Sequence, residues 1–155
     1  FKSFLLDIGL IHTQLKLNPF ETIKTAEINY INKGVLSEQL IAQQLVSQHQ
    51  DFIEPQLYYW AREKKASSAE VDFVITDNKR RIIPIEVKSG STGSMRSLQI
   101  MVTEKSLNLA IRINSDPPSI FYEKRKTPLG YAEYNLYSLP HYLSGQVIRI
   151  VDEIE

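Results

Sequence analysis

The sequence contains no cysteine, which excludes disulfide bonds, zinc–thiolate sites and thiol nucleophiles. It has no net charge either, because 18 basic residues balance 18 acidic ones. Proteins that bind nucleic acid non-specifically are usually basic, so any contact with DNA must come from a local patch. No apolar run approaches the roughly 20 residues of a transmembrane helix. We therefore expect a cytoplasmic protein with no membrane partner.

The amino-acid composition is typical of a globular domain. The chain has 155 residues, of which 43% are hydrophobic and 23% charged. This length suffices for one hydrophobic core. The sequence begins with Phe1 rather than Met and enters a strand-like segment, "KSFLL", at once. We therefore expect residues 1–155 to be a single domain that another domain precedes in a longer chain.

The first half of the sequence favours helices. The segment "FKSFLLDIGLIHTQL" predicts a short strand that runs into a helix capped by Asp7. Residues 21–31 are a weaker helical candidate. Apolar residues recur at helical spacing over residues 34–49 and predict the most regular helix of this half. Glu38 lies on this helix, on or beside its apolar stripe.

The second half predicts strands joined by short turns. Residues 55–63, 70–76 and 81–88 form an antiparallel meander with turns over 64–69 and 77–80. Val71, Phe73 and Ile75 are expected to share one face of the second strand. Pro84 removes one backbone donor from the third strand, which indicates an edge or a bulge there.

A crossover unit follows the meander. The predicted elements are a helix, a parallel strand, a strand that ends at Pro140 and a short final helix, over residues 95–105, 108–113, 131–140 and 146–155. The fold class is therefore α/β, with a mixed sheet that combines an antiparallel meander and a crossover helix and is flanked by helices.

The stretch "IIPIEVKSGSTGS", residues 82–94, carries the main chemical pattern. Side chains alternate along a strand, so Glu86 and Lys88 point to the same face. Glu70 and Asp72 share a face of the preceding strand, and a hairpin through residues 77–80 brings Asp72 beside Glu86. The sequence thus predicts a cluster of carboxylates with one ammonium.

Hydrolysis of a phosphodiester requires groups of this kind. Carboxylate oxygens hold Mg²⁺ or Mn²⁺, which polarise the phosphate and acidify bound water. A nearby lysine orients that water or neutralises charge that develops on the phosphate. The competing interpretation is a structural cluster of cross-strand ion pairs.

The motifs "AEVDFVI" and "IIPIEVKSG" resemble the core of the PD-(D/E)XK nuclease superfamily, which includes restriction endonucleases and archaeal Holliday-junction resolvases. With "FLLDIGL", "GVLSEQLIAQQL" and "LYYWAREK", which come in order over residues 1–112, the chain is similar to one group in particular. This group is the nuclease-like C-terminal domain of unknown function on bacterial and archaeal AAA-type ATPases. The resemblance implies a restriction-endonuclease-like fold and an ATPase domain upstream in the same chain.

The resemblance also implies roles for four residues. Asp72 and Glu86 correspond to the metal ligands, and Lys88 to the catalytic lysine. Glu38 corresponds to the early acidic residue that completes or orients the Mg²⁺ or Mn²⁺ site. Val71 stands where the motif has proline, and Gln99 falls where some members carry a polar residue on the following helix; Glu70 is expected to flank the site.

Three hypotheses for function remain open. The first is a metal-dependent nuclease that hydrolyses DNA. The second is a non-catalytic nucleic-acid-binding or regulatory module with the same fold, for which the basic clusters at Arg62–Lys65, Lys79–Arg81 and 123–126 and the aromatic run Tyr58–Trp60 are candidate contacts. The third is a structural domain that forms homo-oligomers through "QVIRIVDEIE".

Overall fold

The structure is a computed structural model, and it describes residues 2–5, 7–14, 16, 30–49, 52, 54–64, 67–91 and 93–154. Its helices are α1 (Ile8–Gln14), α3 (Tyr30–Ser47), α4 (Arg96–Lys105), the 3-10 helix η1 (His141–Gln146) and α5 (Val147–Glu153). Its strands are β1 (Tyr58–Lys64), β2 (Ser67–Thr76), β3 (Ile82–Val87), β4 (Leu109–Asn114), β5 (Ser119–Thr127) and β6 (Gly130–Pro140).

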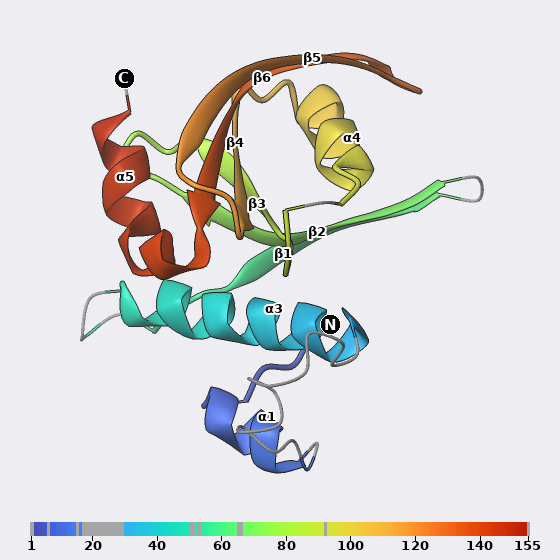
Figure 1. The fold of residues 1–155 in the computed structure, drawn as a ribbon. Helices are drawn as coiled ribbons and strands as arrows, with labels where there is room; N and C mark the ends of the chain where they lie inside the picture. Colours follow the sequence, from blue (N-terminus) through green and yellow to red (C-terminus); the bar gives the residue numbers. More distant parts are fainter. Residues whose placement is uncertain are drawn as a thin grey trace.

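The strands form one six-stranded mixed sheet in the order β1-β2-β3-β4-β6-β5 (Figure 1). β1, β2 and β3 are the predicted antiparallel meander. β3, β4 and β6 run parallel to one another, and β5 pairs antiparallel with β6. The chain crosses from β3 to β4 through α4, as a parallel connection requires. The predicted α/β class, with its meander and crossover helix, is therefore confirmed.

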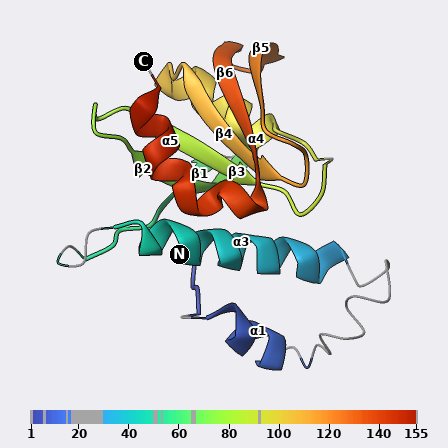
Figure 2. The ribbon, with the colours of Figure 1, turned by 60° about the vertical axis from the view of Figure 1, so that its left-hand side comes forward.

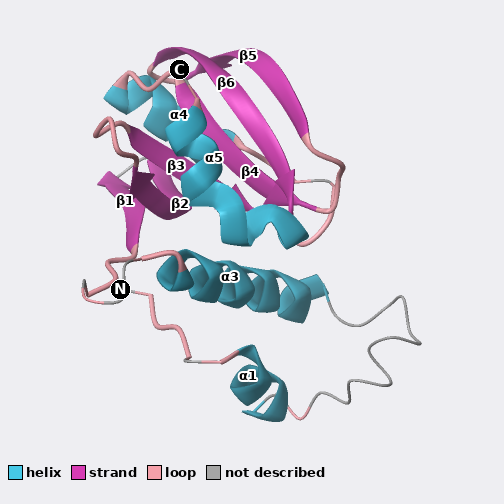
Figure 3. Cartoon of the chain, turned by 90° about the vertical axis from the view of Figure 1, so that its left-hand side faces the viewer, coloured by secondary structure: helices cyan, strands magenta, loops and turns pink. Residues whose placement is uncertain are grey.

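Two hydrophobic clusters lie on the two faces of the sheet. Side chains of α3 and α5, such as Leu45 and Val151, pack with Ile85 and Ile111 in the larger cluster. The smaller cluster lies between the sheet and α4, where Leu98 is fully buried. Figures 2 and 3 show α5 in front of the sheet, α3 along one end of it, and α1 on the far side of α3. The strand β3 is thus enclosed between helices on both faces.

The predictions for the helical half have mixed outcomes. The helix predicted over residues 34–49 is α3, and Asp7 caps α1 by accepting a hydrogen bond of 2.7 Å from the Gly9 N–H. The predicted N-terminal strand is wrong, because residues 2–5 belong to no strand. They instead lie against α3. The helical candidate at 21–31 lies outside the described residues, apart from its last two, which already belong to α3.

Pro84 is in neither an edge strand nor a bulge, so that prediction is wrong. β3 lies between β2 and β4, and its pairing with β2 is regular through Val74 and Pro84. The pairing with β4 begins one residue later, at Ile85. The pairing of β3 with β4 thus starts after the proline, and β3 keeps its central position in the sheet.

The irregularity lies instead on the other side of β2. Tyr58 pairs with Val74 and Trp60 pairs with Val71, so β2 has one residue more than β1 across this stretch. Bulges change the direction of the side chains they contain. Val71 accordingly packs in the cluster under α4, while Phe73 packs in the opposite cluster. The prediction of one shared apolar face on this strand was wrong at Val71.

The final helix is confirmed as α5, and it bears on the oligomer hypothesis. Val147 and Val151 are fully buried, and Ile148, Ile150 and Ile154 pack against the same cluster of this chain. The apolar side chains of "QVIRIVDEIE" that motivated homo-oligomer formation thus contribute to the chain's own core.

Candidate metal and phosphate site

Asp72 and Glu86 lie side by side on neighbouring strands. Phe73 of β2 pairs with Ile85 of β3, so the next residues along the antiparallel pair are Asp72 and Glu86. Asp72 Oδ2 accepts a hydrogen bond of 2.8 Å from the Val87 N–H. This bond holds the Asp72 carboxylate over the end of β3, next to the bulge in β2.

Glu86 is the most deeply buried acid of the group, with 6% of its surface exposed. Its Oε1 accepts a hydrogen bond of 2.6 Å from Lys88 Nζ. Its Oε2 is buried and has no hydrogen-bond partner among the described residues. Burial, together with repulsion from Asp72, raises the pKa of Glu86 to about 7, although Lys88 acts in the opposite direction. The site therefore contains a buried carboxylate that only one cation partly satisfies.

Glu38 reaches the same place from α3, and it meets a residue that the sequence analysis missed. Lys2 Nζ lies 3.3 Å from Glu38 Oε2, 3.3 Å from Asp72 Oδ1 and 2.8 Å from Glu70 Oε1. Burial and repulsion from Asp72 raise the pKa of Glu38, and the charge of Lys2 opposes this rise. Lys2 thus links three carboxylates, including Glu70, which was expected only to flank the site.

The ionisation of Lys2 is fixed by these neighbours. Burial alone lowers the pKa of an ammonium group, but the hydrogen bond to Glu70 and the charges of Asp72 and Glu38 raise the pKa of Lys2 above its usual value. Lys2 therefore remains charged at neutral pH. No spacing in the sequence relates Lys2 to Glu38 and Asp72, which lie 36 and 70 positions later.

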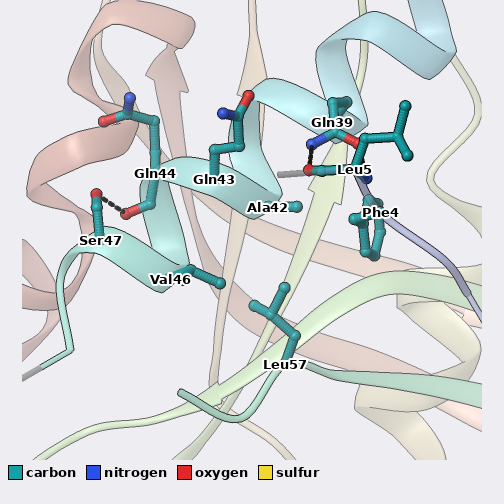
Figure 4. A pocket seen from close by; sticks show the side chains of 9 residues that line it. All are labelled: Phe4, Leu5, Gln39, Ala42, Gln43, Gln44, Val46, Ser47 and Leu57. Atoms are coloured by element: carbon teal, nitrogen blue, oxygen red, sulfur yellow. Dashed lines mark hydrogen bonds between the residues drawn. The ribbon is translucent and has the colours of Figure 1, made fainter. Parts of the chain in front are cut away.

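Hydrogen bonds between the side chain of Gln39 and the backbone of Leu5 hold the segment that carries Lys2 on α3. The side chain of Gln39, which is 2% exposed, accepts a hydrogen bond of 2.9 Å from the Leu5 N–H and donates one of 2.6 Å to the Leu5 carbonyl (Figure 4). The rings of Phe4 and Phe73 lie 5.6 Å apart between centroids. A mainly apolar pocket of 610 Å³, with Leu57 at its far side, adjoins this segment.

The carboxylates open into a second pocket of 260 Å³, lined by Lys2, Glu38, Glu70 and Asp72 among others. Carboxylate oxygens are the ligands that Mg²⁺ and Mn²⁺ prefer, so the chemistry of the donors fits these ions. As the described side chains stand, no three or more of the acids and histidines are placed to hold a metal. The ammonium of Lys2 lies between them instead.

The loop after β3 packs against Lys88. Gly93 has a φ of 149°, and a Cβ atom at this position would lie 2.7 Å from Cδ of Lys88. Residues other than glycine rarely adopt a backbone φ of this sign and size. Gly93 thus lies against the aliphatic stem of Lys88.

The remaining candidates lie elsewhere. Gln99 interacts with Tyr134. Burial raises the pKa of Tyr134 to about 12, and the side chain of Gln99 shifts this pKa in the opposite direction. The side chain of Arg62 is 10% exposed, and its Nε lies 3.0 Å from a carboxylate oxygen of Glu104. Arg81 likewise pairs with Asp77, at 2.6 Å.

Comparisons with known proteins identify one family. Residues 33–134, well over half of the chain, match the family described as "Domain of unknown function (DUF4143)". No curated protein matches the chain. Among the described residues, no helix has the length and apolar character needed to span a membrane. The matched segment contains Glu38, Asp72, Glu86 and Lys88, whereas Lys2 precedes it.

Proposed function

The chain belongs to the DUF4143 family, and from the geometry of its site we propose that it is a metal-dependent nuclease domain that hydrolyses DNA phosphodiesters. The observation that carries this proposal is the carboxylate of Glu86, which is buried beside Asp72 with one oxygen unpartnered among the described residues. A buried carboxylate without full pairing costs stability. A structural ion-pair cluster would satisfy both oxygens, whereas a divalent cation supplies the missing partner.

Each residue has a distinct task in the proposed reaction. Asp72 and Glu86, completed by Glu38, would hold Mg²⁺ or Mn²⁺, which supplies polarisation of the phosphate and acidification of bound water. Lys88 donates to Glu86 Oε1 and so lies beside any phosphate bound at these carboxylates. Its ammonium would neutralise the charge that develops on the phosphate oxygens.

The sequence resemblance adds a partner to this proposal. Its motifs match a nuclease-like domain found on AAA-type ATPases, so we propose that an ATPase domain in the same chain acts with this one. ATP hydrolysis would then regulate when DNA reaches Asp72 and Glu86. The restriction-endonuclease-like character of the fold is part of the same proposal.

The Asp72→Asn variant tests the metal site. We expect wild type to bind Mn²⁺ and the variant to bind it at least about tenfold more weakly, because one charged ligand is lost. Titration calorimetry measures both, with and without DNA, since Mg²⁺ often completes its shell with phosphate oxygens. Branched, linear and single-stranded DNA are then assayed for cleavage. Asp152→Asn, in α5, is the matched control. Equal binding by wild type and Asp72→Asn would contradict the proposal.

A second candidate function is a non-catalytic nucleic-acid-binding module, and one surface favours it. On β5 and β6 the side chains of Ile120, Tyr122 and Tyr131 are 63%, 67% and 60% exposed. Lys124 Nζ lies 5.5 Å from the ring centroid of Tyr131 and 2.6 Å from Glu133. Exposed aromatic rings beside lysines are typical of surfaces on which single-stranded bases stack.

Binding by this surface is tested with Tyr122→Ala combined with Tyr131→Ala. We expect affinity for single-stranded DNA to fall by about tenfold or more, because each stacked base contributes about 1–3 kcal/mol. Fluorescence anisotropy at fixed, moderate salt measures the affinity. Tyr142→Ala removes a tyrosine that is 77% exposed on η1 and serves as control. If the double variant binds as wild type does, this surface does not bind nucleic acid.

A further inference from the structure

The most unusual feature of the site is that an ammonium group of the chain itself lies among the carboxylates. Lys2 Nζ is within 3.3 Å of oxygens of Glu38, Glu70 and Asp72. We propose that Lys2 is a tethered cation that competes with a divalent metal ion for these three carboxylates, so that metal binding releases residues 2–5 from α3. This inference rests on the proposed metal site and names a means of its regulation.

The first argument is spatial. A Mg²⁺ or Mn²⁺ ion bound to Asp72 and Glu38 lies about 2.0–2.6 Å from their oxygens. The Lys2 ammonium lies 3.3 Å from an oxygen of each and thus takes up the same space. Two cations placed there also repel each other, and the repulsion is strong because the Lys2 side chain is only 19% exposed. The two forms of the site therefore exclude each other.

The second argument concerns charge. One ammonium cannot neutralise the carboxylates of Glu38, Glu70 and Asp72, and the additional charge of Glu86 lies next to Asp72. Glu86 Oε2 is buried and has no partner among the described residues, so Lys2 does not satisfy it. This oxygen is independent evidence that the site accepts a further or a more highly charged cation. A divalent ion that binds both Asp72 and Glu86 would provide it.

The third argument concerns the tether. Lys2 is part of residues 2–5, which belong to no helix or strand. Two hydrogen bonds between Gln39 and Leu5 and the contact of Phe4 with Phe73 hold these residues in place. Such a segment opens without disturbing the sheet. It also lies before the family-matched residues 33–134, which contain all the carboxylates. The tethered lysine is thus added to the domain from outside its matched part.

The test compares wild type with Lys2→Met, which keeps the length of the side chain and removes its charge. We expect Lys2→Met to bind Mn²⁺ about tenfold more tightly in titration calorimetry, a common magnitude for coupling between competing ligands. In wild type, Mn²⁺ is also expected to accelerate hydrogen exchange of the Leu5 amide, which donates to Gln39. Lys105→Met, an exposed lysine of α4, is the control for removal of one positive charge.

The outcomes separate this inference from the proposed function. Tighter binding by Lys2→Met alone, with faster exchange at Leu5 in wild type, supports competition. Equal or weaker binding by Lys2→Met than by wild type overturns the inference and leaves the metal site standing. If neither wild type, Lys2→Met nor Lys105→Met binds Mn²⁺, the metal site itself is refuted, and the competition with it.

Discussion

The Glu86→Gln variant is expected to be more stable than wild type at pH 9, with a free energy of unfolding about 3 kcal/mol higher. At pH 4 the two free energies of unfolding are expected to be similar. The reason is the pKa of Glu86, which burial and then Asp72 raise from 4.5 to about 7 in the folded chain. The folded state binds the proton more tightly than the unfolded state does. Wild-type stability therefore falls as the pH rises from about 4.5 through 7 and stays low above that. Glutamine carries no charge at any of these pH values.

Urea unfolding at several pH values between 4 and 9, without divalent metal, measures this difference. The pKa of Glu38 is raised as well, so the stability of the variant still depends on pH, although more weakly than that of wild type. Glu63→Gln replaces an exposed glutamate of β1 and controls for the loss of one carboxylate. If the difference in free energy of unfolding between wild type and Glu86→Gln is the same at every pH, the difference arises from packing rather than from ionisation of Glu86.

The Lys88→Met variant is expected to cleave DNA about 10²–10³-fold more slowly than wild type while still binding Mn²⁺. The ammonium of Lys88 donates to Glu86 Oε1, and it is not itself a metal ligand. Its removal would take away the charge that, in the proposed reaction, stabilises the transition state, and would leave the carboxylates of Asp72 and Glu86 in place. Loss of cleavage with retained metal binding is the pattern of a catalytic lysine.

Single-turnover cleavage and Mn²⁺ calorimetry on the same preparation measure the two properties. Lys105→Met, outside the site, is the control for both. Cleavage at the wild-type rate by Lys88→Met would assign Lys88 a purely structural role as the partner of Glu86. If wild type does not cleave DNA, and Lys88→Met binds DNA as well as wild type does, the results would instead favour the non-catalytic module.

The parts of the fold that local pattern determines were predictable from the sequence. The apolar spacing of α3, the turn between β2 and β3 and the alternation along β3 identified these elements, and they carry Glu38, Asp72 and Glu86. The adjacency of Asp72 and Glu86 followed from one hairpin, since an antiparallel register fixes which side chains face each other.

Features that depend on the whole sheet were not predictable in this way. Pro84 was assigned to an edge because nothing local shows that β4 would pair beyond it. The strand β5 was missed because the charges at 123–126 obscured it, although its apolar start and the turn at 128–129 were visible. The contact of Lys2 with Asp72 joins residues 70 positions apart, and no spacing rule relates them.

The position of α5 also has a consequence for the order in which a growing chain completes the core behind β3. Arg81, just before β3, donates to the carbonyls of Val151 and Ile154, which come 70 and 73 positions later in the sequence. The side chain of Val151 fills the same core as Ile85, on the strand of Glu86. During synthesis on the ribosome, Asp72 and Glu86 emerge long before these partners do. The strands that carry Asp72 and Glu86 therefore gain their contacts with α5 only after residues 147–154 have also left the ribosome.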